Sequence, residues 1–115
     1  MHSLLKGLRV VDLSTIVLGP YATQFLGDFG ADVIKVEAQG GDVFRAVRPG
    51  RTEDLGAGFL NFNRNKRSLA VDLKQPQGRE ILHKLVAQAD VLVHNMRGKS
   101  AQDLGADFAT LKMIN

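Results

Sequence analysis

Short apolar runs alternate with segments whose apolar residues recur at helical spacing. Residues 8–13 and 32–37 are rich in valine, leucine and isoleucine, which is typical of strands buried on both faces of a sheet. Residues 68–72 and 90–94 have the same character. Because parallel neighbours need crossover connections and helical segments separate these runs, the pattern predicts an α/β fold, a Rossmann-like parallel sheet flanked by helices.

The first predicted helix has a recognisable beginning and end. Pro20 has the fixed φ of a first helical turn. Aromatic residues then recur at i, i+4 and i+8, at Tyr21, Phe25 and Phe29, and give the helix one apolar side. Gly30 is expected to end the helix in the left-handed conformation.

Two further helices are expected in the second half of the chain. One covers residues 77–89, and the other covers residues 107–114 and begins with the capping residue Asp107. Residues 39–58 contain several glycines without a sustained period and predict a long surface loop. Residues 98–105 predict a loop with one helical turn.

Composition narrows the classes of protein. The 115 residues form one domain at most and contain no cysteine, which excludes disulfides, thiolate metal sites and a cysteine nucleophile. Because cysteine is absent and the chain has only three histidines, we expect no metal centre. No stretch approaches the roughly 20 apolar residues of a membrane span, and Lys6 interrupts the start of the chain. We therefore expect a soluble, cytoplasmic protein.

Positive charge is concentrated in the middle of the chain. The net charge is +3, and residues 45–74 contain seven basic and three acidic residues. The strongest local signal is the run Asn-Arg-Asn-Lys-Arg-Ser at residues 63–68, since guanidinium and ammonium groups bind phosphate oxygens. A bound anion and ordinary solvated surface charge both explain this pattern.

Ligands of open α/β sheets bind at the carboxyl ends of the strands, which places the candidate site in the loops after the four predicted strands. The first loop leads into a helix N-terminus, where free N–H groups favour an anion. Glu37 stands where a dinucleotide enzyme has its ribose-binding carboxylate, but the first loop lacks the G-x-G-x-x-G spacing. Asp12, Asp32 and Asp90 are expected in turn or capping roles. No nucleophile motif is present, so residue chemistry alone indicates an α/β anion-binding domain.

Five stretches carry a family resemblance from about residue 5 to residue 115. They are residues 7–14 (GLRVVDLS), 19–23 (GPYAT), 26–37 (LGDFGADVIKVE), 60–74 (LNFNRNKRSLAVDLK) and 89–95 (ADVLVHN). In this order and spacing the chain resembles the N-terminal part of the class III (CaiB/BaiF) CoA transferases. The block at residues 63–68 favours transferases over the alternative of an alpha-methylacyl-CoA racemase-like member of the same superfamily.

The resemblance implies an enzyme that moves CoA from an acyl-CoA donor to a carboxylic acid through an aspartyl anhydride and thioester. No residue before Asn115 matches the motif of that aspartate, so we assign no catalytic residue. Residues 1–115 are then an incomplete N-terminal CoA-binding domain, inactive alone, whose longer parent chain forms an interlaced homodimer. CoA or acyl-CoA is the implied substrate, with no metal, no membrane partner and nucleic acid disfavoured.

The resemblance also implies CoA contacts at three strand-end loops. By position these contacts are Val17 and Leu18, then Val71, Asp72, Leu73 and Lys74, and finally Asn95, Met96 and Arg97. Residues 95–99 (NMRGK) depart from the usual N-F-R-P-G, and Ala38 and Asp103 replace basic residues. The rival interpretation is a non-catalytic basic module that binds nucleic acid or another polyanion through Arg64, Lys66 and Arg67.

Overall fold

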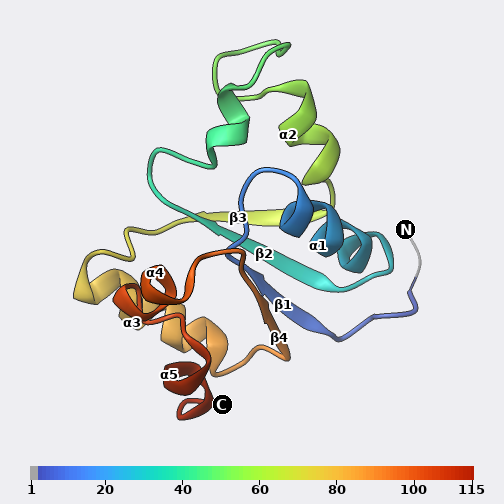
Figure 1. The fold of residues 1–115 in the computed structure, drawn as a ribbon. Coiled ribbons are helices and arrows are strands. Elements are labelled where there is room, and N and C mark those ends of the chain that lie inside the picture. Colours follow the sequence, from blue (N-terminus) through green and yellow to red (C-terminus); the bar gives the residue numbers. More distant parts are fainter. Residues whose placement is uncertain (1–2) are drawn as a thin grey trace.

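Four parallel strands form one sheet in the order β3-β2-β1-β4 (Figure 1). The structure is a computed structural model that describes residues 3–115. The strands are β1 (Arg9–Asp12), β2 (Asp32–Glu37), β3 (Lys66–Ala70) and β4 (Val91–Val93). This order puts the first strand inside the sheet and brings the carboxyl ends of all four strands to one edge. The α/β prediction is confirmed.

Helices cover both faces of the sheet. They are α1 (Leu18–Asp28), the 3-10 helix η1 (Val43–Ala46), α2 (Ala57–Phe62), α3 (Pro76–Val86), α4 (Gly98–Asp103) and α5 (Phe108–Lys112). A large apolar cluster joins the sheet to α3 and α5 and includes Val11, Val36 and Leu82. A smaller cluster, centred on Val10 and Val33, lies on the face that α1 covers. Among residues 3–115, no helix has the length and apolar character needed to cross a membrane.

Helix α1 ends as its sequence predicts. Gly30 has a φ of +103°, and its N–H donates to the Gly27 carbonyl at 3.0 Å. The Ala31 N–H then donates to the Leu26 carbonyl, also at 3.0 Å. These two bonds satisfy carbonyls at the helix C-terminus and turn the chain into β2.

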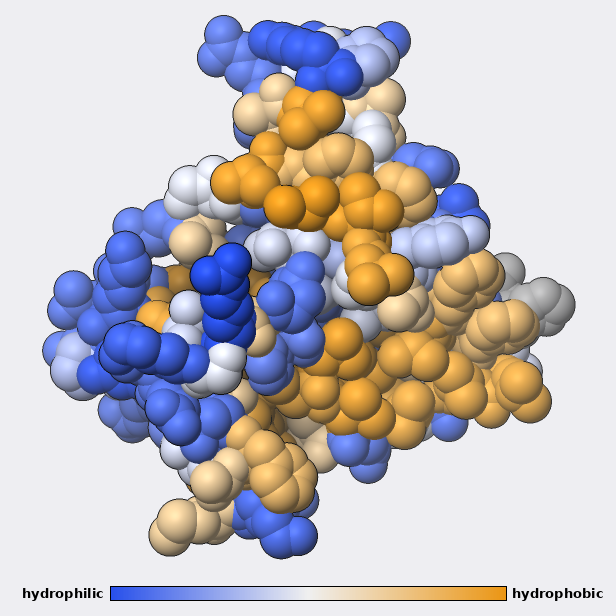
Figure 2. Space-filling model, viewed as in Figure 1, coloured by the Kyte–Doolittle hydropathy of each residue, from blue (hydrophilic) through white to orange (hydrophobic). Residues whose placement is uncertain are grey.

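The apolar stripe of α1 faces outward, away from the sheet. Tyr21 and Phe25 are 45% and 47% exposed, and Figure 2 shows apolar side chains gathered over α1 and around η1. The side that packs inward is small and polar instead. A Cβ on Gly27 would lie 3.1 Å from the Asn65 carbonyl oxygen, and the Thr23 hydroxyl donates to Asp12. Close backbone approach and a buried polar contact therefore decide the orientation of α1.

The predicted loop at residues 39–58 is wrong in part. Asp42 caps η1 by accepting a hydrogen bond from the Phe44 N–H, and the start of α2 falls inside the predicted loop. Helix α2 buries Phe59, so tertiary packing stabilises a six-residue helix that shows no sequence period.

Several other boundaries differ from the sequence prediction. Strand β3 begins at Lys66, two residues early, because Lys66 and Arg67 align with Val33 and Ile34 of β2. Helix α3 ends three residues before the predicted end, and residues 98–103 form a complete short helix. The predicted cap of the last helix is confirmed, since Asp107 accepts a hydrogen bond from the Thr110 N–H at 3.1 Å.

Candidate functional site

A cleft of about 230 Å³ opens at the carboxyl ends of the strands. Five residues predicted as site residues line it, namely Val71, Asp72, Leu73, Lys74 and Met96. Leu13 and Thr15, from the end of β1 and the loop after it, form the neighbouring wall. Val36, Glu37 and Asp42 add the end of β2, so the cleft brings together segments from the ends of all four strands.

Asn95 joins two of these loops rather than lining the cleft. Its amide oxygen accepts the Thr15 N–H at 3.1 Å, and its amide nitrogen donates to the Thr15 carbonyl at 2.9 Å. Val17, Leu18 and Arg97 are exposed residues beside these loops and stand outside the cleft wall. The structure thus groups the predicted loops but separates these three side chains from the cleft.

The loop after β1 is anchored on Asp12, a fully buried carboxylate. Asp12 accepts hydrogen bonds from the Ser14 N–H at 2.9 Å, from the Ser14 and Thr23 hydroxyls, and from Lys66 Nζ at 2.9 Å. Lys66 also donates to the Pro20 carbonyl in the first turn of α1. Asp12 has a larger role than the expected turn contact, because it links β1, α1 and β3. The sequence feature that could have indicated this role is the position of Asp12 at the carboxyl end of an apolar strand.

A second buried pair lies on the other side of this loop. Lys35 Nζ is 3.0 Å from Asp42 Oδ2 and donates to the Ser14 carbonyl at 3.0 Å. Asp42 accepts the Ile16 N–H at 3.1 and 3.2 Å through its two oxygens. Ile16 has a φ of +72°, in the left-handed region that a β-branched residue rarely adopts. Sequence reasoning missed this pair, since its members belong to a strand and to a predicted loop.

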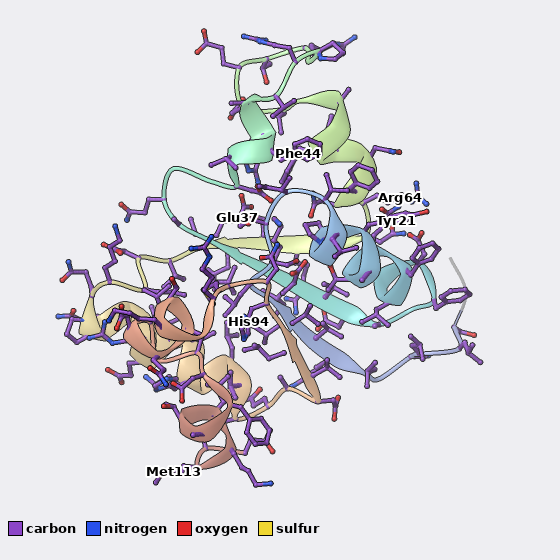
Figure 3. The ribbon with its side chains drawn as sticks, in the orientation of Figure 1. Tyr21, Glu37, Phe44, Arg64, His94 and Met113 are labelled. Atoms are coloured by element: carbon purple, nitrogen blue, oxygen red, sulfur yellow. The ribbon has the colours of Figure 1, made fainter. Side chains whose placement is uncertain are left out.

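Glu37, at the end of β2 (labelled in Figure 3), is bound by Arg45 of η1. Arg45 donates to both of its oxygens at 2.7 Å, and the Asp42 N–H donates to Oε2 at 2.8 Å. The Arg45 guanidinium lies 4.0 Å from the centroid of the Phe59 ring. Burial raises the pKa of Glu37, but the Arg45 and Asp42 hydrogen bonds outweigh it and hold the pKa below the ordinary value. This carboxylate is occupied, which argues against the ribose-binding role of a dinucleotide enzyme.

The cations at residues 63–68 are paired within the fold. Arg64 contacts Asp28 at 2.9 Å, Lys66 contacts Asp12 at 2.9 Å, and Arg67 contacts Asp32 at 2.7 Å. Burial lowers the pKa of Lys66 more than Asp12 raises it, and the Lys66 side chain is 2% exposed. The expectation that these residues supply counter-charge to an anion is therefore not met for Lys66, and Arg64 and Arg67 already hold carboxylates.

The loop after β3 is fixed against the start of α3. A Cβ on Gly78 would lie 1.9 Å from the Asp72 carbonyl oxygen, so only glycine permits this packing. Arg79 donates to the carbonyls of Leu73 and Lys74, both at 3.1 Å. The Lys74 side chain is exposed, and no ion pair found within residues 3–115 includes it. An available cation thus stands at the cleft mouth beside the first turn of α3.

Three carboxylates line the cleft, and each already has partners. Glu37 is bound by Arg45, Asp42 by Lys35, and Asp72 accepts the Lys74 N–H at 3.0 Å. A nucleophilic carboxylate needs an oxygen free to attack the substrate. Glu37 and Asp42 have both oxygens engaged, whereas Asp72 accepts this turn contact through one oxygen only.

A larger hollow of about 580 Å³ lies elsewhere, between β4, the end of α3 and α5. His94 and Phe108 line it, but none of the predicted site residues does. His94 Nδ1 accepts the Met96 N–H at 3.1 Å, a local turn contact that occupies one ring nitrogen. We therefore take the cleft at the strand ends as the candidate site.

Comparison with known proteins identifies the family. The sequence model of CoA-transferase family III matches residues 5–115. Succinyl-CoA:mesaconate CoA-transferase of Haloarcula hispanica is 42% identical over 115 residues, which cover 96% of this chain and 29% of the relative. Succinate–glutarate CoA-transferase of Agrobacterium fabrum is 41% identical over 118 residues, which cover 96% of this chain and 30% of the relative.

Solved structures agree with the sequence comparison. A CaiB/BaiF family protein from Brucella suis superposes with a TM-score of 0.93 and 41% identity, covering 100% of this chain and 32% of that one. A short chain dehydrogenase/reductase family protein, 17% identical with a TM-score of 0.55, shares the fold alone. The chain spans about 30% of the length of the relatives that it matches. On these grounds the chain belongs to CoA-transferase family III.

Proposed function

We propose that these residues form the CoA-binding rim of an enzyme that transfers CoA from an acyl-CoA donor to a carboxylic acid. The observation that carries the proposal is the cleft at the strand ends, which is lined by the whole implied contact segment after β3, residues 71–74, and by Met96 after β4. Relatives named for succinyl-CoA, mesaconate and glutarate support a carboxylic acid as acceptor. The whole protein is proposed to act in the cytoplasm as a homodimer.

The cleft suits part of a CoA molecule. Leu13, Val36, Val71 and Met96 give it apolar walls that fit the pantetheine arm. Lys74 and the first N–H groups of α3, which no side chain caps, offer positive charge to phosphate oxygens. Ligand pockets usually measure about 300–1,000 Å³, so a cleft of about 230 Å³ accommodates a portion of the coenzyme.

The proposed reaction proceeds by covalent catalysis at an aspartate. An aspartate oxygen attacks the carbonyl carbon of the acyl-CoA thioester. The C–S bond breaks, CoA leaves as a thiolate, and the acyl group stays on the aspartate as a mixed anhydride. The thiolate then attacks the aspartyl carbonyl, which releases the donor acid and leaves an enzyme thioester. The acceptor carboxylate then attacks the enzyme thioester, which releases the CoA thiolate and forms a second mixed anhydride. The thiolate attacks the acceptor acyl carbonyl of this anhydride, which gives the acceptor CoA thioester and regenerates the aspartate. Glu37 and Asp42 have both oxygens engaged, and no residue before Asn115 matches the motif that the family resemblance implies for the nucleophile. We therefore propose that the 115-residue chain binds CoA without turnover.

Calorimetric titration of the purified chain with CoA tests the proposal. We expect saturable binding that Lys74→Ala weakens by about tenfold, as for loss of a charged hydrogen bond. Lys84→Ala is the matched control, because Lys84 pairs with Glu80 on the outer side of α3. Absence of binding by the wild type, or equal losses in both variants, would refute the proposal.

The polyanion alternative has little support from the geometry, since Lys66 is buried and Arg64 and Arg67 hold carboxylates. Titration with single-stranded DNA at several salt concentrations separates the two functions. We expect weak DNA binding and a preference for CoA. A steep salt slope together with a preference for DNA would instead favour a basic binding module.

A further inference from the structure

A buried ion pair lies directly behind the loop that follows β1. Lys35 Nζ is 3.0 Å from Asp42 Oδ2, and the two side chains are 2% and 0% exposed. Lys35 belongs to β2, whereas Asp42 precedes η1 and caps it. The Phe59 ring, whose centroid is 5.8 Å from Lys35 Nζ, flanks the pair from α2. Buried charges persist when they are paired and hydrogen-bonded, so the other partners of this pair show what it organises.

Those partners are backbone groups of the loop after β1. The Ile16 N–H donates to both oxygens of Asp42, at 3.1 and 3.2 Å. Lys35 Nζ donates to the Ser14 carbonyl at 3.0 Å. The ion pair therefore holds a carbonyl and an N–H that are two residues apart, on either side of Thr15. Thr15 itself lines the cleft and is bonded to Asn95 on its other side.

Ile16 has a backbone conformation that its own side chain opposes. Its φ of +72° lies in the left-handed region, where β-branched residues are genuine outliers. Such a conformation persists only where the surroundings impose it, and it occurs often at ligand-binding sites. Here the two contacts from the Ile16 N–H to Asp42 supply that constraint.

We propose that Lys35 and Asp42 are positioning residues for CoA, which they influence by fixing the conformation of residues 15–17. The inference rests on the proposed function for the identity of the ligand, CoA. The effect of the ion pair on the conformation of the loop does not depend on that function. Thr15 and Asp42 both line the cleft, so a change in the ion pair reaches a bound ligand through one stretch of backbone.

Two measurements on the 115-residue chain test this role, namely CoA affinity by calorimetry and hydrogen exchange of the Ile16 amide by NMR. Asp42→Ala removes the acceptor of the Ile16 N–H. We expect it to weaken CoA binding by about tenfold or more and to accelerate exchange of the Ile16 amide. Asp42→Asn keeps one acceptor oxygen and is expected to show a smaller change in both measurements. If the alanine variant does not fold, the asparagine variant provides the test in its place.

A rescue variant separates control of the loop from a general contribution to folding. Glycine adopts positive φ without strain, so Ile16→Gly needs less help from Asp42. In the Asp42→Ala background, we expect Ile16→Gly to restore part of the lost CoA affinity. A double variant that binds CoA no better than Asp42→Ala would count against control through Ile16.

Val33→Ala is the matched control for loss of stability. Val33 lies on β2, two residues before Lys35, and it packs in the smaller apolar cluster away from the loop. We expect it to lower stability and leave CoA affinity within about twofold of the wild type. An equal loss of affinity in Val33→Ala would overturn the proposal, because general destabilisation would then explain the result.

The amide-exchange measurement distinguishes this inference from the proposed function. If the wild type does not bind CoA, the proposed function fails, and Ile16 exchange still decides whether the pair sets the loop conformation. Unchanged exchange of the Ile16 amide in both Asp42 variants would overturn the inference whatever the CoA titration shows.

Discussion

Strands β1 and β2 present apolar side chains to α3, but they present charged side chains to α1 and α2 near their carboxyl ends. On the first face, Val11, Ile34 and Val36 belong to the large apolar cluster. On the second face, Asp12 and Lys35 are neighbours in the parallel register and are both buried. The α3 face is therefore packed by apolar side chains, whereas the α1 face combines a small apolar cluster with hydrogen-bonded charge near the carboxyl ends of the strands.

The difference teaches where shape is specified in this fold. Apolar burial is non-directional, so the α3 face stabilises the sheet and tolerates substitutions that conserve volume. Hydrogen bonds to buried charges are directional, and loss of one partner leaves the other unsatisfied. The charged face thus sets the conformation of the loop after β1, and hence one wall of the cleft.

Removal of Asp12 should give the largest effect on stability. Asp12→Ala leaves Lys66 buried without a counter-ion and removes the acceptor for Ser14 and Thr23. We expect the free energy of unfolding to fall by about 3–5 kcal/mol. Urea denaturation measures this loss. The exposed Asp103, which pairs loosely with Lys99, provides the control, since Asp103→Ala should change stability by less than about 1 kcal/mol. Similar losses in both variants would contradict the comparison of the two faces.

Substitution on the apolar face should have a somewhat smaller and more graded effect. Leu82 of α3 is fully buried in the large apolar cluster. We expect Leu82→Ala to reduce the free energy of unfolding by about 3 kcal/mol and Leu82→Met by less than about 1.5 kcal/mol. The same urea denaturation checks both values. If Leu82→Met were as harmful as Leu82→Ala, this face would need shape as specific as that of the charged face.

Acid should weaken the contact between Glu37 and Arg45, which is the smallest effect we predict. Because the pKa of Glu37 in the folded chain is below its ordinary value of 4.5, the contact stabilises the fold above that pH. This contribution is lost as the pH falls below 4.5 and through the lower value of the folded state. As the pH falls from 6 to below 4.5, we expect the free energy of unfolding to decrease less in Glu37→Gln than in the wild type. Parallel acid profiles from denaturant unfolding would show that the contact does not contribute.

Local signals in the sequence predicted most of the secondary structure. The apolar run at residues 32–37 coincides with β2, and Gly30 and Asp107 mark a helix end and a helix start as expected. These features depend on a few neighbouring residues. Helix α2 was missed because its stability depends on burial of Phe59, a tertiary effect that no local period records.

The loops of the candidate site were predictable, but their supports were not. Parallel strands end at one edge of a sheet, so the residues after them were expected to converge there, as Leu73 and Met96 do. The charged pairs escaped prediction because their members are distant in sequence, with Asp12 and Lys66 separated by 54 positions. The same distance hid the carboxylates that neutralise the basic run at residues 63–68.

An NMR titration of the isotope-labelled chain with CoA tests the central claim most directly. The account predicts that the largest amide shifts occur in residues 15–18, 71–74 and 95–97, around the cleft. Shifts confined to the hollow between β4 and α5, or centred on Arg64 and Arg67, would contradict it, and so would a spectrum that CoA leaves unchanged.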